Sequence, residues 1–190
     1  MKIRFLAYLL MPLFIFTACR NNNGSGITDE EYKNTSDALV GANRILVEKD
    51  RARIESFAER KGWEMQESQT GLWSQIYEKG KGPAAQKGML VTLKYTLSLM
   101  DGTVCYSSDS LGYKQFRIGS GGVESGLEEG VLILEEGDRA RFILPPHMAH
   151  GLTGDGDKIP PRSIIVYDVE VIKLETGTGE SDTGRGGNNV

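Results

Sequence analysis

The sequence predicts an α+β domain in which a curved antiparallel sheet wraps on a short helix. Apolar and polar side chains alternate along residues 90–99, which is typical of an antiparallel strand with one buried face. Asp101-Gly102 follows directly and is a hairpin signal. A second long apolar strand occupies residues 164–174, so the domain core extends over about 72–175.

Shorter segments complete the predicted sheet. "KQFRIGSG" reads as a short strand, and residues 127–132 as a short helix that ends before the turn "EEGD". "RARFILPP" is expected to be a strand, because Arg139 and Arg141 alternate with Ala140 and Phe142.

The N-terminus predicts export. Residues 1–18 place Lys2 and Arg4 before an apolar run, which is typical of a signal peptide. "FTAC" resembles a bacterial lipobox, in which cleavage leaves Cys19 to carry the lipid, although Phe16 stands where an aliphatic residue is usual. Ordinary secretion with cleavage nearby is the alternative. The lipid would tether the chain to a membrane of the bacterial cell envelope. "RNNN" after Cys19 contains no acidic cluster, which favours the periplasmic side.

Composition divides the rest of the chain. Residues 19–38 are polar and predict a flexible tether, and residues 39–62 predict a helix that ends at Gly62. This helix either packs on the domain or spaces it from the membrane, and a role in dimerisation is the alternative. Residues 63–175 form the domain, and the Gly-rich residues 176–190 are expected to be disordered.

Charge and residue types exclude several function classes. A net charge of −4 and a pI of about 5.3 provide no dominant basic patch for nucleic acid. Cys105 is the only cysteine besides Cys19, so no disulfide framework is expected. The sequence has no metal-ligand spacing, no catalytic triad and no cofactor motif, and we expect neither a metal nor a cofactor.

Two prolines stand before the last strand, in "DKIPPRSIIVYDVEV". Proline cannot donate a ladder hydrogen bond and stiffens the chain. Pro160 and Pro161 therefore either protect an edge from pairing or hold a loop that frames a site.

The order of these pieces resembles the FKBP-type peptidyl-prolyl cis-trans isomerase domain. The resemblance depends on the "KYT" strand with its Asp-Gly turn, on "GLEEGV" before "EEGDRARFILPP", and on "HGLTG" and "IPP" before "IIVYDVEVIKLE". It covers over half the chain. Together with the lipobox, the sequence is similar to periplasmic and gliding-motility-type FKBP lipoproteins.

The resemblance implies an isomerase that acts on proline-containing polypeptides and assists the folding of exported proteins. Such a site binds the twisted prolyl amide in an apolar, water-poor pocket, without cofactor or metal. It implies that the loop before "IPP" overhangs this pocket. The residues carried over as catalytic are Tyr95, Tyr167 and His150, and those carried over as substrate-binding are Cys105, Tyr106, Phe116, Val123, Glu124, Leu127 and Ile159.

The sequence departs from the family at several of these positions. Cys105 and Tyr106 replace an aromatic residue and an aspartate, and Lys114 falls where a pocket aromatic is often found. Glu124 replaces an aliphatic residue, and His150 replaces a tyrosine that donates a hydrogen bond to the ligand. We therefore expect reduced isomerase activity. The alternatives are a non-catalytic FKBP-like lipoprotein that binds a peptide or partner, and a scaffold that works through its N-terminal helix.

Overall fold

The computed structural model describes residues 29–176. The predicted signal peptide, the lipidation site Cys19, the first part of the predicted tether and nearly all of the predicted tail lie outside the described residues. The chain divides into two compact units, and the boundary between them falls after Asn43.

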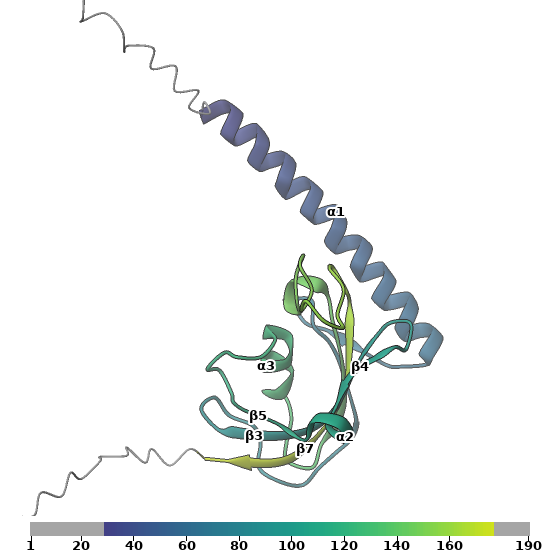
Figure 1. Ribbon diagram of the computed structural model, residues 1–190, viewed down its shortest axis with the longest axis vertical. Coiled ribbons are helices and arrows are strands. Elements are labelled where there is room, and N and C mark those ends of the chain that lie inside the picture. Colours follow the sequence, from purple (N-terminus) through teal and green to yellow (C-terminus); the bar gives the residue numbers. More distant parts are fainter. Residues whose placement is uncertain (1–28, 177–190) are drawn as a thin grey trace, which may run out of the picture. The chain divides into compact units, whose positions relative to one another are not determined.

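A long helix comes first, and strands interrupted by short helices follow it (Figure 1). Their bounds are α1 Asp29–Lys61, β1 Gln66–Glu67, β2 Trp73–Glu78, β3 Leu90–Leu99, β4 Val104–Ser107, α2 Ser108–Leu111, β5 Lys114–Arg117, α3 Ser125–Val131, β6 Arg139–Leu144, a 3₁₀ turn at Pro146–Met148, and β7 Ile165–Glu175. The α+β class, both long strands, the hairpin at Asp101-Gly102 and the short helix are confirmed.

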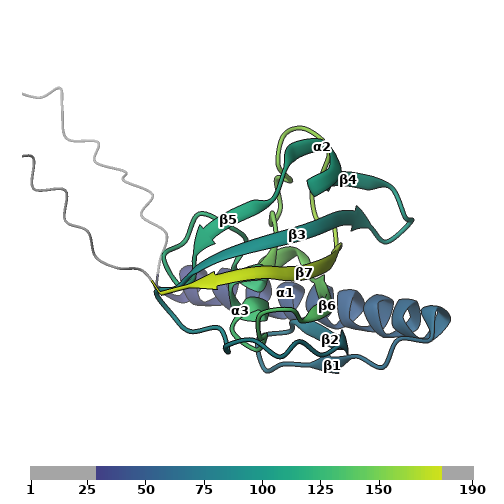
Figure 2. The same ribbon diagram turned by 90° about the horizontal axis from the view of Figure 1, so that it is seen from below.

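One antiparallel sheet has the strand order β1-β2-β6-β7-β3-β4, and β5 also pairs with β3. The two longest strands, β3 and β7, run side by side through its centre (Figure 2). Their register pairs Tyr95 with Val169 and Leu97 with Tyr167. Because side chains alternate between faces, Tyr95 and Tyr167 then lie on the same face of the sheet, two positions apart.

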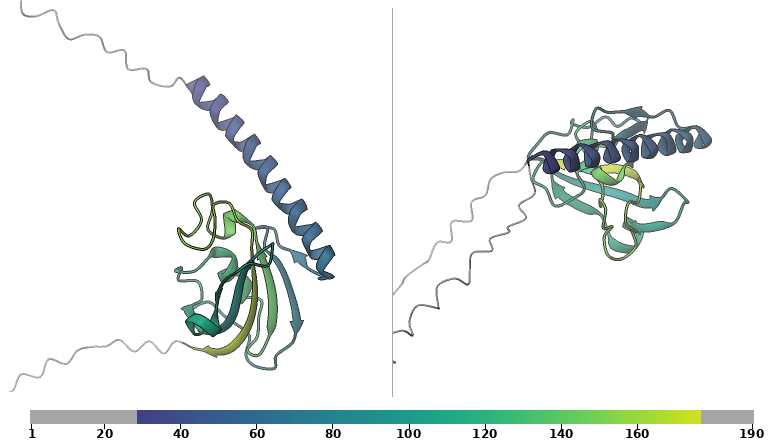
Figure 3. Two further views of the ribbon diagram at one scale, coloured as in Figure 1. Left: turned by 45° about the vertical axis from the view of Figure 1, so that its right-hand side comes forward. Right: turned by 90° about the horizontal axis from the view of Figure 1, so that it is seen from above.

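The short helix α3 lies against the concave face of the sheet (Figure 1), and the left view of Figure 3 shows the curve of the sheet. Its two glycines explain the close approach. A Cβ at Gly130 would lie 2.8 Å from the Phe142 ring, and a Cβ at Gly126 would lie 2.5 Å from the Leu144 side chain. The "GLEEG" pattern is therefore a packing requirement of this helix.

The opposite face of the sheet carries a second, smaller core. Ile54 and Phe57 of α1 are buried there against side chains of β2, β6 and β7, namely Trp73, Ile143 and Val166. Both faces of β7 are thus covered at its start, which explains why its sequence begins as a continuous apolar run instead of an alternating one. Residues 44–61 therefore pack on the domain.

The helix begins earlier than the sequence predicted. It starts at Asp29, so the expected start at residue 39 is wrong, and the last ten residues of the predicted tether 19–38 are helical. No proline interrupts residues 29–61, and the Ala, Glu, Lys and Arg residues that dominate residues 42–61 favour helix, so the helix extends N-terminally through the weaker helix formers 34–37. The end is as predicted: Gly62 adopts a φ of 66°, and the amides of Gly62 and Trp63 bond to the carbonyls of Glu59 and Ala58.

The two prolines precede a strand in the middle of the sheet. β7 pairs with β6 and β3 from its first residue, Ile165, so edge protection does not explain them. Ile159 in front of them is buried. Arg162 behind them has a φ of 57°, and its guanidinium donates a 2.6 Å bond to the buried Asp50 of α1. The loop is thereby attached to the helix.

Candidate functional site

Two tyrosines from the central strands form the base of the candidate site. The ring centroids of Tyr95 and Tyr167 are 6.1 Å apart with an interplanar angle of 49°. Tyr167 is fully buried and Tyr95 is 7% exposed. Leu127 of α3 and Ile159 of the proline loop belong to the same buried core. With Cys105 and Phe116, which lie in the same cluster, six of the residues carried over from the family are core side chains.

Polar and charged side chains gather above this base. A hollow of about 420 Å³ is lined by Lys114, Gly122, Val123, Glu124, Ala149 and His150. We call it the Glu124 hollow. It combines the end of the loop before α3 with His150, which follows the 3₁₀ turn, and with the first residue of β5. The resemblance implied an apolar pocket, whereas three of the six residues that line this hollow are ionisable.

Glu124 connects these groups. Its Oε1 accepts hydrogen bonds from the Tyr167 hydroxyl at 2.9 Å and from the Nε2 of His150 at 3.0 Å. The ammonium of Lys114 lies 3.8 Å from Oε2 and donates to the Tyr167 hydroxyl at 3.3 Å. Burial and the negative charge of Glu124 both raise the pKa of Tyr167. Tyr167 therefore stays a neutral hydrogen-bond donor.

Cys105 and Tyr106 contact the loop that carries Ile159. The thiol of Cys105 is buried, 3.5 Å from the carbonyl of Lys158, and burial raises its pKa. The Tyr106 hydroxyl donates to the Asp155 carboxylate at 2.5 Å. The other Asp155 oxygen accepts from the amides of Asp157 and Ile159 at 2.9 and 2.8 Å.

These bonds shift the pKa values of both side chains. Burial of Asp155 opposes its ionisation, but the hydroxyl of Tyr106 and the two amides outweigh it and lower the Asp155 pKa to about 2. The bond to Asp155, and then burial, raise the pKa of Tyr106 to about 12. Asp155 was not predicted from the sequence, although "GDGDK" has the Asp and Gly residues of an Asx turn.

The structure thus brings the predicted residues together in two groups. Tyr95, Tyr167, Glu124 and His150 are connected by direct contacts, and Val123 lines the same hollow. Cys105, Tyr106 and Ile159 meet around Asp155 and Lys158. Phe116 packs in the main core from β5, as does Leu127 from α3. Their roles toward a substrate stay predictions.

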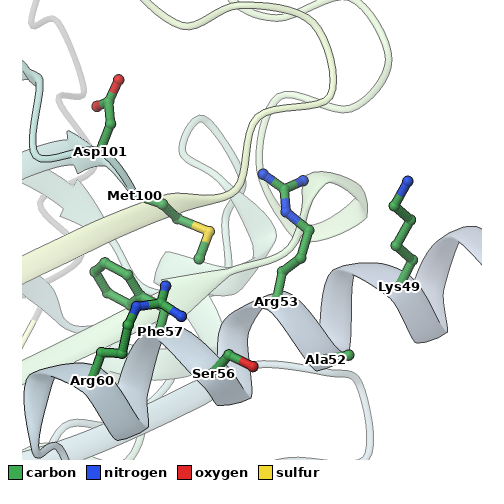
Figure 4. Close-up of a pocket in the computed structure, with 8 residues that line it drawn as sticks. All are labelled: Lys49, Ala52, Arg53, Ser56, Phe57, Arg60, Met100 and Asp101. Carbon is green, nitrogen blue, oxygen red and sulfur yellow. The ribbon is translucent and has the colours of Figure 1, made fainter.

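A second hollow lies along α1 and contains none of the predicted site residues (Figure 4). It measures about 560 Å³, and its residues are Lys49, Ala52, Arg53, Ser56, Phe57 and Arg60 of α1 with Met100 and Asp101 of the β3–β4 turn. Within residues 29–176, no helix is long and apolar enough to cross a membrane. In the same residues, no three His, Cys, Asp or Glu side chains are grouped so that they could hold a metal ion.

Comparison with known proteins agrees with this geometry. Residues 82–172 match the model of the FKBP-type peptidyl-prolyl cis-trans isomerase family. The chain is 35% identical over 108 residues to FK506-binding protein 2 of Yarrowia lipolytica, covering 56% of this chain and 75% of that protein. It is 32% identical over 164 residues to the isomerase FkpA of Escherichia coli, covering 80% of this chain and 59% of FkpA.

A solved structure shows the same fold. The crystal structure of FkpA from Escherichia coli superposes with a TM-score of 0.57 at 31% identity, covering 80% of this chain and 75% of that one. The chain is 38% identical over 106 residues to the probable isomerase FkpA of Neisseria meningitidis, and this match spans 38% of the length of that protein. The sequence matches and the shared fold agree with the tyrosine pair and the buried proline loop described above. The chain belongs to the FKBP-type peptidyl-prolyl cis-trans isomerase family.

Proposed function

We propose that this protein accelerates the cis–trans isomerisation of Xaa–Pro bonds in exported polypeptides. The observation that supports it best is the tyrosine pair Tyr95–Tyr167 beneath the loop of Ile159, in a chain of this isomerase family. Rotation about an Xaa–Pro bond breaks amide resonance and takes tens of seconds unaided. A side-chain environment that binds the twisted amide better than the planar one is sufficient to accelerate it.

The residues around the Glu124 hollow supply what such a reaction needs. Val123 lines the hollow and packs against the buried core that contains Tyr95 and Leu127, and this apolar side can replace water around the prolyl ring. The Nε2–H of His150, which donates to Glu124 in the free protein, can donate instead to a substrate carbonyl. None of these groups has to transfer a proton or form a covalent bond, because the reaction changes only a torsion angle.

The protein is further proposed to be anchored in the bacterial cell envelope through a lipid on Cys19, with the domain facing the periplasm. The apolar run and the "FTAC" sequence support this proposal. Labelled palmitate fed to producing cells should enter the protein and should fail to enter Cys19→Ser. A protein that stays unlabelled and is released into the periplasm would instead support ordinary secretion.

The isomerase proposal is tested with the full-length protein in detergent and short Xaa-Pro peptides. We compare His150→Leu with His147→Leu, because both histidines lie in the same segment but only His150 lines the hollow. Losing this half-buried donor should lower kcat/KM about fivefold or more in His150→Leu. His147 bonds to the Thr70 carbonyl away from the hollow, and its variant should keep the wild-type rate.

Two results would overturn the proposal. A folded protein that accelerates no peptide would act as a binding protein, and the ligand of the Glu124 hollow would then have to be identified. Equal losses in both histidine variants would show that the activity does not come from this hollow.

A further inference from the structure

The carboxylate of Glu124 has one oxygen without a hydrogen-bond partner. The side chain is only 8% exposed. Oε1 accepts two hydrogen bonds, whereas the buried Oε2 accepts none from residues 29–176. A buried carboxylate oxygen that lacks a donor costs free energy, because water satisfied it in the unfolded chain. The hollow therefore holds an acceptor that a ligand can satisfy.

Lys114 occupies the place of such a donor without bonding to Oε2. Its ammonium is 3.8 Å from Oε2, beyond hydrogen-bond distance, and 5.2 and 5.7 Å from the ring centroids of Tyr95 and Tyr167. A cation above two aromatic rings and beside a carboxylate is favourably placed. The hollow is thus built to hold a positive charge, and its own lysine holds that position in the free protein.

The side chain of Lys114 can also move out of the Glu124 hollow. Its side chain is 25% exposed, and its flexible stem of four carbons reaches solvent by rotation alone. The tyrosine rings and the carboxylate do not have the same freedom, because Tyr95, Tyr167 and Glu124 are buried. An incoming cation would therefore meet a rigid site after one mobile side chain moves away.

We propose that a cationic side chain of the substrate replaces Lys114, and that this isomerase prefers prolines adjacent to arginine. The inference rests on the proposed isomerase function. A guanidinium is planar, stacks on tyrosine rings, and offers parallel N–H groups to a carboxylate, including the unsatisfied Oε2. Lysine offers the same charge without that geometry. The expected order of preference is arginine, lysine, leucine and glutamate, the last being repelled by Glu124.

The preference is measured as kcat/KM of the full-length protein for peptides that differ only in the residue before proline, and then only in the residue after it. Arginine should exceed leucine about fivefold or more in one of the two series, a ratio typical of a charge-assisted hydrogen bond. Glu124→Gln should bring the ratio of arginine to leucine close to one. Glu129→Gln, in the helix that directly follows Glu124 but bonded to Thr70, should keep it.

A second variant works in the opposite direction. Lys114→Met removes the internal cation while keeping a similar chain length, so the ratio of arginine to leucine should rise. This variant keeps the test decisive if Glu124→Gln does not fold. Isothermal titration with the same peptides gives the ratio as binding constants, even in the absence of turnover.

Failure of this inference differs from failure of the isomerase proposal. Rates that are accelerated equally for arginine, leucine and glutamate, or a ratio that Glu124→Gln leaves unchanged, would overturn the arginine preference alone. Absence of acceleration with every peptide would overturn the isomerase function, and equal binding constants would then overturn the preference as well.

Discussion

The hydroxyl of Tyr106 and the carboxylate of Asp155 hold the loop that carries Ile159. Asp155 has its pKa lowered to about 2, below the ordinary value near 3.9 of an unfolded chain. The unfolded chain therefore binds this proton more tightly than the folded protein. It follows that Asp155 stabilises the fold fully above about pH 4, and that this contribution is lost as the pH falls from 4 toward 2.

Asp155→Asn should consequently lower the stability at pH 7 and have a clearly smaller effect at pH 2.5, where much of the contribution is already lost. The urea midpoints of wild type and variant at the two pH values measure this effect. The difference between the two proteins is compared at each pH, because the other carboxylates titrate in wild type and variant alike. Tyr106→Phe removes only the hydroxyl and should show the same pattern in weaker form. A difference that is constant with pH would mean that Asp155 acts through packing instead of its charge.

Single residues also show where sequence reasoning stopped. The resemblance selected Tyr95 and Tyr167, and the structure places their rings together because adjacent strands fix their register. It could not reveal that the Glu124 side chain turns inward to Tyr167 and His150, since that depends on the path of a loop between β5 and α3. The type of a residue does not determine the direction in which its loop orients the side chain.

Helix α3 offers a matched pair of glycine substitutions. Gly130→Ala places a methyl group 2.8 Å from the Phe142 ring and should destabilise the domain by about 1–3 kcal/mol through overpacking. Gly41→Ala lies in the interior of α1 with no atom within 4 Å, and there the better helix propensity of alanine should be neutral or stabilising by up to about 1 kcal/mol. Urea unfolding measures both, and the same sign for both would contradict the packing argument.

Helix α1 and the proline loop are joined by the pair Asp50–Arg162. The Asp50 side chain is 8% exposed and the Arg162 side chain 32%. Removing Asp50 takes the carboxylate away from the half-buried guanidinium of Arg162, whereas removing Arg162 leaves Asp50 paired with Arg53 at 3.7 Å. Asp50→Ala should cost about 1–3 kcal/mol of stability. Arg162→Gly should cost less, because glycine is relaxed at a φ of 57°.

The double variant Asp50→Ala with Arg162→Gly isolates the interaction. If the pair couples the helix to the loop, the double variant should lose less stability than the sum of the two single variants. Strict additivity would show that the 2.6 Å bond contributes nothing to the fold.

Elements were predicted best where their pattern is periodic. Residues 90–99 and 139–144 alternate clearly, and both became strands at the predicted places. The start of α1 was missed because polar residues such as Asn34 and Ser36 carry no apolar period, so the segment has the composition of a linker. Helix propensity without periodicity is a weak signal in a sequence.

The boundary between the two compact units predicts how the stability of the domain depends on where a truncated chain starts. A chain that starts at Arg44 should keep the urea midpoint of the full-length protein. A chain that starts at Glu59 lacks Ile54 and Phe57, which are buried against Trp73 and Ile143, and it should lose about 3–5 kcal/mol. A loss already present in the chain that starts at Arg44 would show that residues before it stabilise the domain.

The fold of the domain could be predicted as a whole because many short motifs occur in a fixed order. The second core beneath Ile54 and Phe57 could not be predicted, because the apolar stripe of α1 is interrupted at Lys49–Arg53. Its partners Ile143 and Val166 lie about 90 and about 110 residues further along the chain. Local patterns identify elements, whereas a contact between distant elements depends on how the sheet curves.

The pairing of β3 with β7 has a consequence for the moment at which the protein becomes active. Leu90 pairs with Glu175, and the site tyrosines lie on these two strands. The chain is made from its N-terminus, so Tyr95 waits for some seventy residues before its partner Tyr167 exists. Contacts of such large sequence separation form late in folding. A nascent chain therefore has no prolyl site, and this member of the family can act on other chains only after its own last strand has been made and paired.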